Sequence, residues 1–221
     1  DYGKGLVFAP LVGFIMGAVL AGAMYILNLV FPVKVTAVFI VIIYILLSGG
    51  LHLDGLGDTF DGLFSNRSRE KILEIMRDSR VGTNAVLAIA GVLILNTALL
   101  SNMDSSLIYT AVMLFPAAGR IGSLIGSGVS TYARTGEGLG KSFIDYCGWK
   151  EIAAGLALSY VIFYLAAGVK GLVLCTAASV FAFLLTKAFS KRIGGATGDI
   201  LGAVCELNQT LFMIMLYLMR I

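Results

Sequence analysis

Charged residues are scarce in this sequence, and their scarcity excludes most soluble folds. Only 13% of its 221 residues are Asp, Glu, Lys or Arg, whereas a soluble globular domain carries about 25%. Hydrophobic residues make up 58% of the chain, and the mean hydropathy is +0.93. There is too little charge to cover a water-facing surface, so we expect lipid to surround most of the chain.

The sequence also lacks a strong net charge, paired cysteines and a recognisable signal peptide. A net charge of +3 provides no clustered basic face, so we expect no nucleic acid among the partners. The cysteines are odd in number and form no CxxC motif, which argues against a disulfide framework or a zinc site. We interpret all three as small apolar residues: Cys147, Cys175 and Cys205. No basic segment leads into a short apolar stretch and a cleavage site, so we expect no signal peptide.

Long runs without charge predict seven transmembrane helices. A helix needs roughly 20 mostly apolar residues to cross a bilayer. The runs lie between Lys4 and Lys34, between Lys34 and His52, between Arg80 and Asp104, over 106–126, between Glu151 and Lys170, between Lys170 and Lys187, and over 199–219. Six or eight spans are the alternatives. The predicted fold class is all-α: a polytopic integral membrane helix bundle in a single domain, 1–221, with amphipathic helices on its cytoplasmic side.

The segments between the predicted spans differ in length and charge. On the seven-span arrangement, the long segments fall on the side of the N-terminus: 51–82, 127–150 and 187–198. Most Lys and Arg residues lie in these segments, and positive charge marks the cytoplasmic face of a membrane protein. We therefore expect a multi-pass protein of the cell (cytoplasmic) membrane whose polar chemistry faces the cytoplasm.

Three aspartates follow the second predicted span at helical spacing. Asp54, Asp58 and Asp61 stand at i, i+4 and i+7, which places them on one stripe of a helix. Aligned carboxylates repel one another and destabilise a helix. A divalent cation offsets this repulsion, and Mg²⁺ or Mn²⁺ prefers such oxygen ligands. A solvated acidic loop is the weaker alternative, because such loops rarely keep helical spacing among apolar residues.

A basic amphipathic helix is predicted over 67–80. Taken alone, it is typical of a helix anchored on anionic lipid. Next to the aspartates, Arg77 and Arg80 are candidates for holding phosphate oxygens, which the arginine fork binds in pairs. Asp78 is either a further metal ligand or a partner that orients an arginine.

Other cationic candidates come from the middle of the chain. Arg120 interrupts an apolar run, so it either reaches the interface or faces a phosphate within the bundle. The loop 126–143 is rich in Gly, Ser and Thr and carries Arg134 and Lys141. Such a loop can wrap a phosphate with its backbone N–H groups. A flexible connector explains it equally well.

Near the last predicted span, Asp199 and Glu206 stand at i and i+7, again on one helical stripe. This second acidic pair supports the metal interpretation, and polar packing between helices is its alternative. His52, the only histidine, precedes the acidic helix. It is a candidate general base or a partner of another polar group, and a hydrogen-bonded interfacial histidine is the alternative. Together these groups indicate phosphoryl or nucleotidyl transfer, and they name no substrate.

Four stretches resemble the cobalamin synthase family, the adenosylcobinamide-GDP ribazoletransferases. They are residues 49–62, 74–83, Phe115-Pro116 with Arg120, and 195–206. The resemblance implies a Mg²⁺-dependent late step of vitamin B12 assembly. In that step α-ribazole, or its 5′-phosphate, attacks the cobinamide-side phosphate of adenosylcobinamide-GDP. GMP leaves, and adenosylcobalamin or its 5′-phosphate forms.

The resemblance also implies roles for the candidate residues. Asp54, Asp58 and Asp61 would hold Mg²⁺ on the diphosphate. Further ligands would come from Asp78, Asp199 or Glu206. Phosphate would be neutralised by Arg77, Arg80 and Arg120, with Arg134 and Lys141 as further substrate contacts. The residues implied in the chemical step are His52, as base, together with Asp58 and Asp61. The implied partners are the two substrates and the bilayer, and a homo-oligomer is left open.

Two other functions compete with this interpretation. A CDP-alcohol phosphotransferase of phospholipid synthesis has a similar helix of spaced aspartates, but its DGxxAR motif is absent after Asp61-Gly62. A cation transporter with intramembrane carboxylates is the other alternative. Transport favours acidic groups near the bilayer midplane, whereas these lie at the predicted ends of the spans. Family members usually begin with a further hydrophobic stretch carrying a Phe-Leu-Thr-Arg-Ile-Pro-like motif, which does not precede Asp1 here.

Overall fold

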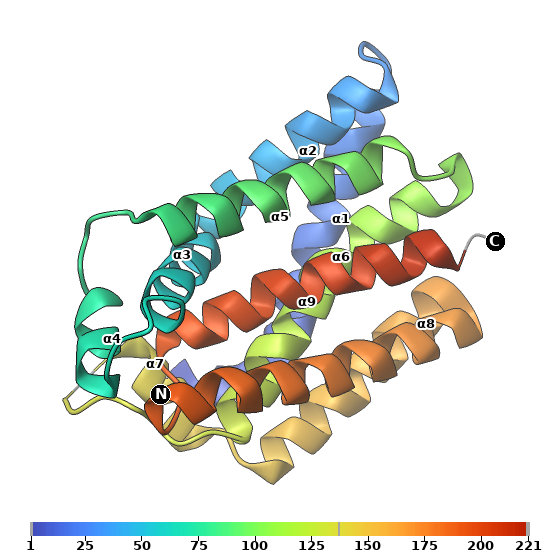
Figure 1. The fold of residues 1–221 in the computed structure, drawn as a ribbon. Helices are drawn as coiled ribbons and strands as arrows, with labels where there is room; N and C mark the ends of the chain where they lie inside the picture. Colours follow the sequence, from blue (N-terminus) through green and yellow to red (C-terminus); the bar gives the residue numbers. More distant parts are fainter. Residues whose placement is uncertain (1, 137, 220–221) are drawn as a thin grey trace.

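The structure, a computed structural model, describes residues 2–136 and 138–219, and these residues are almost entirely helical (Figure 1). They form η1 (Tyr2–Phe8), α1 (Ala9–Leu27), α2 (Val33–Ser48), α3 (Leu51–Leu63), α4 (Arg69–Ile75), α5 (Thr83–Ser101), α6 (Ser105–Gly128), α7 (Leu139–Tyr146), α8 (Trp149–Ile193) and α9 (Gly198–Leu218). In this part of the chain the one strand-like pairing is an isolated parallel bridge between Tyr132 and Ala196. The predicted all-α class is confirmed.

Within the described residues, five helical segments are long and apolar enough to cross a membrane. They begin at Gly3, Thr83, Ser105, Trp149 and Gly198. α2 qualifies only together with α3, from which it is bent by 89°, and this pair raises the count to six. Length and composition therefore give fewer spans than the predicted seven, and the difference comes from α8.

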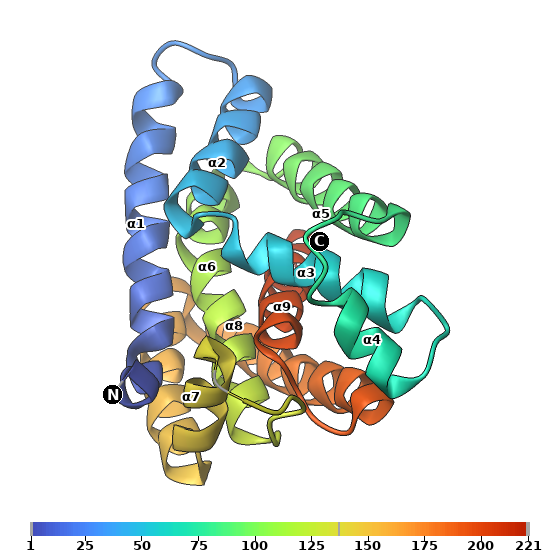
Figure 2. The ribbon, with the colours of Figure 1, turned by 90° about the vertical axis from the view of Figure 1, so that its left-hand side faces the viewer.

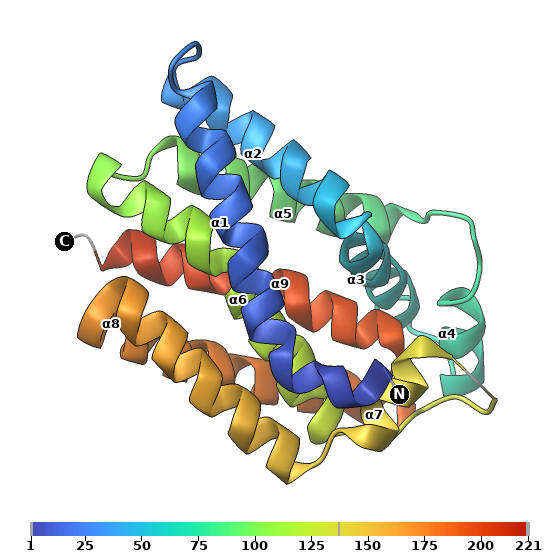
Figure 3. The same ribbon diagram turned by 180° about the vertical axis from the view of Figure 1, so that it is seen from behind.

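α8 consists of two antiparallel helices that meet at Gly168. Gly168 has φ 58° and ψ −140°, a backbone conformation that suits glycine. The chain reverses there, so the hydroxyl oxygens of Tyr160 and Thr176 lie 2.9 Å apart. The two halves run side by side (Figures 1 and 3). Seven crossing segments result when each half of α8 is counted as one segment and α2 is counted as another.

Two helices form the centre of the bundle and the others surround them. Along the most apolar stretches of α6 and α9, 78% and 72% of the residues are buried. The corresponding share is 22–28% in α1, α5 and α8. The outer helices therefore present apolar side chains outward, as lipid-facing helices do. α1 packs closely on α6, because Gly13 and Gly17 lie directly against the α6 backbone.

The connecting segments divide between the two ends of the bundle. α3, α4, α7 and η1 gather at one end (Figure 2), whereas the α1–α2 turn, the α5–α6 turn and the reversal of α8 lie at the other (Figure 3). This arrangement confirms the predicted grouping of 51–82, 127–150 and 187–198 with the N-terminal residues. Which face of which membrane this end occupies stays a prediction.

Candidate active site

A cavity of about 640 Å³ lies at the end of the bundle that carries α3 and α7. Sites for small molecules and cofactors usually measure about 300–1,000 Å³. Its walls come from the N-terminal helices, α3, α6, α7, α9 and the loop between α6 and α7. Six predicted site residues line it: His52, Asp54, Arg77, Arg120, Arg134 and Asp199. The fold thus brings together polar groups from segments that are distant in the sequence.

α3 lies directly across the start of α9, because glycines leave the two backbones in contact. A Cβ atom on Gly55 would lie 2.9 Å from the carbonyl oxygen of Asp199, and one on Gly202 would lie 3.2 Å from the backbone of His52. Glycine permits this approach. The crossing places Asp54 and Asp199 on the same cavity.

Arg134 joins three segments at the cavity wall. Its Nη2 donates to Oδ2 of Asp199 at 2.6 Å and to the carbonyl oxygen of Met76 at 3.2 Å. The hydroxyl of Thr197 donates to the same carboxylate oxygen at 3.2 Å. Arg134, in the loop after α6, is therefore part of the cavity wall. A smaller cavity of about 330 Å³ lies alongside and shares Arg77 and Arg134 with the first.

Asp58 is partly buried on α3 among other acidic groups. Burial raises its pKa to about 7, and the negative charges of Asp199 and Asp54 add to the rise. The carboxylates of α3 and α9 therefore act on one another electrostatically. A cation placed among them would relieve this repulsion.

Asp61 has a role that sequence reasoning missed. Its two carboxylate oxygens accept hydrogen bonds from the backbone N–H groups of Gly82, at 2.6 Å, and Ala85, at 2.9 Å. These groups open α5, whose first N–H groups have no partner within the helix. Asp61 therefore caps α5 from α3, and this role stands beside its predicted role as a metal ligand.

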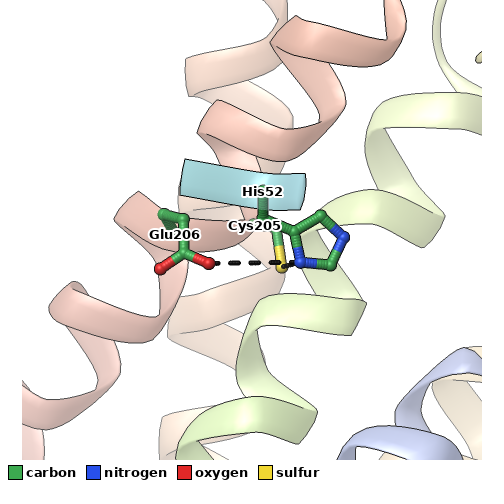
Figure 4. A group of neighbouring side chains, drawn as sticks. All are labelled: His52, Cys205 and Glu206. Atoms are coloured by element: carbon green, nitrogen blue, oxygen red, sulfur yellow. Dashed lines mark hydrogen bonds and ion pairs between the residues drawn. The ribbon is translucent and has the colours of Figure 1, made fainter. Parts of the chain in front are cut away.

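A buried cluster lies at the inner side of α3 (Figure 4). Nδ1 of His52 lies 3.5 Å from Sγ of Cys205 and 4.0 Å from Oε1 of Glu206. The hydroxyl of Tyr44 donates to that Glu206 oxygen at 2.6 Å. Among the described residues, this is the one trio of His, Cys, Asp or Glu whose ligand atoms all lie within 4.8 Å. Cys205, predicted to be a small apolar residue, is buried but packs against polar groups.

Two properties of this cluster bear on its chemistry. Burial lowers the pKa of His52 to about 4, with a smaller contribution from Arg120, so the imidazole is neutral at pH 7. Glu206 is 1% exposed and does not line the cavity. Glu206 therefore packs among polar groups between the helices, and its role as a metal ligand stays a prediction.

Arg120 is buried in the bundle without a carboxylate partner. Its side chain contacts the hydroxyl of Tyr44 and the carbonyl oxygen of Pro116, both at 3.4 Å, and Sδ of Met16 at 3.3 Å. No carboxylate of the described residues lies within 4 Å of it. Arg120 is 7% exposed and lines the cavity, so it does not reach out to the interface.

Six predicted residues do not line the cavity: Asp58, Asp61, Asp78, Arg80, Lys141 and Glu206. Arg80 pairs with Asp78 at 2.6 Å on the surface, and its hydrogen bonds lower the pKa of Asp78 to about 2. Asp78 therefore orients an arginine, the alternative that its position left open. Lys141 pairs with Asp145 at 2.7 Å, one turn along α7.

Sequence reasoning also missed two serines of α6 that line the cavity, although Oγ of Ser127 is itself buried. Ser123 and Ser127 stand at i+3 and i+7 from Arg120, so the three residues share one face of the helix. Helical spacing of this kind also identified the acidic stripe of α3. In α6 the spacing is a weaker signal, because serine is common in packed membrane helices.

Residues 1–217 match the family model described as Cobalamin-5-phosphate synthase. The chain belongs to this family. It is 60% identical over 220 residues to the Adenosylcobinamide-GDP ribazoletransferase of Acetivibrio thermocellus, covering 100% of this chain and 89% of that protein. The protein of the same name from Clostridium acetobutylicum is 53% identical over 218 residues, covering 98% and 86%. No solved structure matches the chain.

The family match confirms the resemblance predicted from the four motifs. The matched residues, 1–217, include every position that lines the cavity. The family match also rules against the phospholipid-synthesis and transporter interpretations, because neither belongs to this family.

Proposed function

We propose that this chain transfers the adenosylcobinamide-phosphate group of adenosylcobinamide-GDP to α-ribazole or α-ribazole 5′-phosphate. The products are GMP and adenosylcobalamin or its 5′-phosphate. The names of the relatives give the reaction. The cavity is the observation that supports this reaction for the chain, because it gathers arginines and acidic side chains beside a neutral histidine.

The acidic groups at the cavity fit Mg²⁺. Asp54 and Asp199 line it, and Asp58 interacts electrostatically with both. Carboxylate oxygens together with substrate phosphates are the usual ligands of Mg²⁺. The trio of His52, Cys205 and Glu206 lies deeper and mixes nitrogen and sulfur, which suits softer metals. When bound, Mg²⁺ would neutralise negative charge on the diphosphate.

Arg77 and Arg134 would hold the diphosphate of the donor. Both line the large and the small cavity, so they stand at the border between the two. Guanidinium groups bind phosphate oxygens through paired, charge-assisted hydrogen bonds. A diphosphate held at this border leaves the two ends of the donor free to extend in different directions.

His52 would accept the proton of the attacking ribose hydroxyl. The hydroxyl oxygen forms a bond to the cobinamide-side phosphorus, and the bond from that phosphorus to the bridging oxygen breaks. GMP leaves with the electron pair of the broken bond. A proton on Nδ1, directed at Cys205 and Glu206, leaves Nε2 able to receive the hydroxyl proton.

The proposal is tested with the purified chain in detergent, supplied with adenosylcobinamide-GDP, α-ribazole 5′-phosphate and Mg²⁺. We expect GMP to form and to stop forming when EDTA removes the metal. Asp54→Asn should reduce turnover by about 10²–10⁴-fold, because the change removes a charged ligand from the reacting phosphates. Asp145→Asn, a surface change of the same kind, should have no effect. Sustained GMP release in EDTA would contradict the metal assignment.

A further inference from the structure

Three side chains with metal-binding atoms meet behind the wall of the large cavity (Figure 4). Nδ1 of His52 lies 3.5 Å from Sγ of Cys205 and 4.0 Å from Oε1 of Glu206, and all three atoms lie within 4.8 Å of one another. His52 belongs to α3, whereas the other two residues are neighbours on α9. The missing CxxC motif therefore does not exclude a metal site here, because the ligands come from two crossing helices.

The distances within this trio match a tetrahedral zinc site. Zinc binds a histidine nitrogen at about 2.0–2.1 Å, a cysteine sulfur at about 2.3 Å and a carboxylate oxygen at about 2.0–2.2 Å. Tetrahedral angles then separate nitrogen from sulfur by about 3.5 Å and nitrogen from oxygen by about 3.4 Å. The first separation is already present, and the second requires the Glu206 carboxylate to approach His52 by about half an ångström.

The mixture of ligands selects the kind of ion. Mg²⁺ prefers an octahedron of oxygen ligands, and the trio offers a single carboxylate. Imidazole and thiolate suit Zn²⁺, whose two charges the thiolate of Cys205 and the carboxylate of Glu206 would match. The acidic groups proposed for Mg²⁺, Asp54 and Asp199, lie on the cavity wall instead. The trio is therefore chemically distinct from the proposed magnesium site.

The groups around the trio would support metal ligands. Nε2 of Gln209 lies 3.7 Å and Nη1 of Arg120 lies 4.0 Å from Sγ of Cys205, so a thiolate there would accept from two N–H donors. The hydroxyl of Tyr44 donates to Oε1 of Glu206 at 2.6 Å. Hydrogen bonds of this kind orient metal ligands and strengthen binding.

The cavity provides a path to the trio. The side chain of His52 is 23% exposed and lines the cavity, as do Gly202 and Ser123, which interacts with the thiol of Cys205. Water from the cavity can therefore complete a fourth coordination position. Zinc-bound water ionises near pH 7, so this fourth ligand can supply the negative charge that balances Arg120.

We propose that His52, Cys205 and Glu206 bind one Zn²⁺ and that the bound ion inhibits the transfer reaction. Zinc binding follows from the cluster alone, and it releases the thiol proton of Cys205 to water. Inhibition rests on the proposed function, in which Nε2 of His52 accepts the ribose proton while Nδ1 carries the proton of the neutral imidazole. Zinc on Nδ1 leaves that one proton on Nε2, so this nitrogen no longer accepts the ribose proton.

The first test measures zinc binding without substrate. The purified chain in detergent is treated with EDTA and then dialysed to equilibrium against Zn²⁺ in excess Mg²⁺, and we expect one tightly bound Zn²⁺ per chain. Cys205→Ser should weaken binding by at least about 10-fold, because loss even of a group that supports a metal ligand costs about 10- to 100-fold. Glu206→Gln should weaken it as well. Cys175→Ser, which changes another buried free thiol, should leave the affinity unchanged.

The second test measures GMP release at saturating Mg²⁺ with and without Zn²⁺. Zinc should reduce GMP release by the wild-type chain and by Cys175→Ser. In Cys205→Ser the ratio of the two rates should return toward one at the same zinc concentration. This ratio separates the trio from any exchange of zinc for magnesium on the cavity wall, because such an exchange would not depend on Cys205.

Each outcome decides a separate question. Absence of zinc binding by the wild-type chain, or equal affinity in Cys205→Ser, would overturn the zinc site. If Cys205→Ser fails to fold, judged by its melting transition in detergent, Glu206→Gln decides by the same criterion. Bound zinc with unchanged GMP release would overturn the inhibition and support the site. Absence of GMP release from the wild-type chain without zinc would instead contradict the proposed function, and dialysis would still decide the zinc site.

Discussion

Charged side chains at the surface and in the site differ in how far away their partners lie in the sequence. On the surface, Arg80 pairs with Asp78, two residues away, and the two side chains are 88% and 36% exposed. In the site, Arg134 pairs with Asp199, 65 residues away, and they are 13% and 21% exposed. Both pairs are 2.6 Å long.

Length therefore does not distinguish the two pairs, but their consequences differ. A local pair can form in a short segment whether or not the rest of the chain is folded, and exposed pairs contribute about 0–1 kcal/mol. A pair between distant segments exists only in the fold, so it fixes the position of each group. We expect the effect of a substitution to follow the sequence distance to the partner.

The largest difference should appear between Arg134→Met and Arg80→Met. Arg134→Met removes bonds to Asp199 and Met76 and a border cation of the cavity. We expect a 10- to 100-fold loss of kcat/KM for GMP release, as loss of a charge-assisted bond in the transition state predicts. Arg80→Met should change kcat/KM less than twofold. Equal losses of kcat/KM in the two variants would contradict the expectation that the effect follows the sequence distance to the partner.

A stability effect is expected at Asp61. Asp61→Ala leaves the N–H groups of Gly82 and Ala85 without their acceptor, so we expect a loss of about 3 kcal/mol in the free energy of unfolding. Melting in detergent measures this loss. Asp54→Ala is the matched control on the same helix, because its exposed carboxylate should affect turnover far more than melting. Full stability in Asp61→Ala would leave only the metal role for this residue.

Arg69 provides an intermediate case. Its guanidinium donates to the carbonyl oxygen of Ile193 at 2.7 Å and to that of Ala133 at 2.8 Å, so it ties α4 to two distant segments. The side chain is 47% exposed, and we expect Arg69→Met to cost about 1–2 kcal/mol. A several-fold loss of kcat should accompany it, because Ala133 precedes Arg134. Melting and GMP release in parallel would check both, and wild-type values of both would contradict the role.

The sequence predicted features that depend on local periodicity. The stripe of Asp54 and Asp58, the apolar runs and the grouping of the long segments at one end all follow from spacing and charge. The reversal at Gly168 confirms the boundary between two predicted spans, because it lies next to Lys170, the charge that separates the two apolar runs.

Partners could not be predicted, because they depend on the path of the chain in three dimensions. Nothing near Asp61 indicates that it caps α5, and nothing near Arg134 identifies Asp199 as its partner. The same limit explains why Arg80 and Lys141 were expected to bind phosphate. A cation beside a motif is a candidate by proximity, and the fold decides whether it faces the cavity.

The smallest effect is expected for Lys71 and Glu74 on α4. They form an exposed i,i+3 pair at 2.7 Å, with side chains 52% and 69% exposed. A double-mutant cycle with Lys71→Met and Glu74→Met, read by melting in detergent, should give a coupling free energy of about 0.3–0.5 kcal/mol. High salt should reduce it further, because exposed charges are screened. A coupling above about 1.5 kcal/mol would mean that sequence distance does not separate weak pairs from strong ones, since such values belong to coupled buried networks.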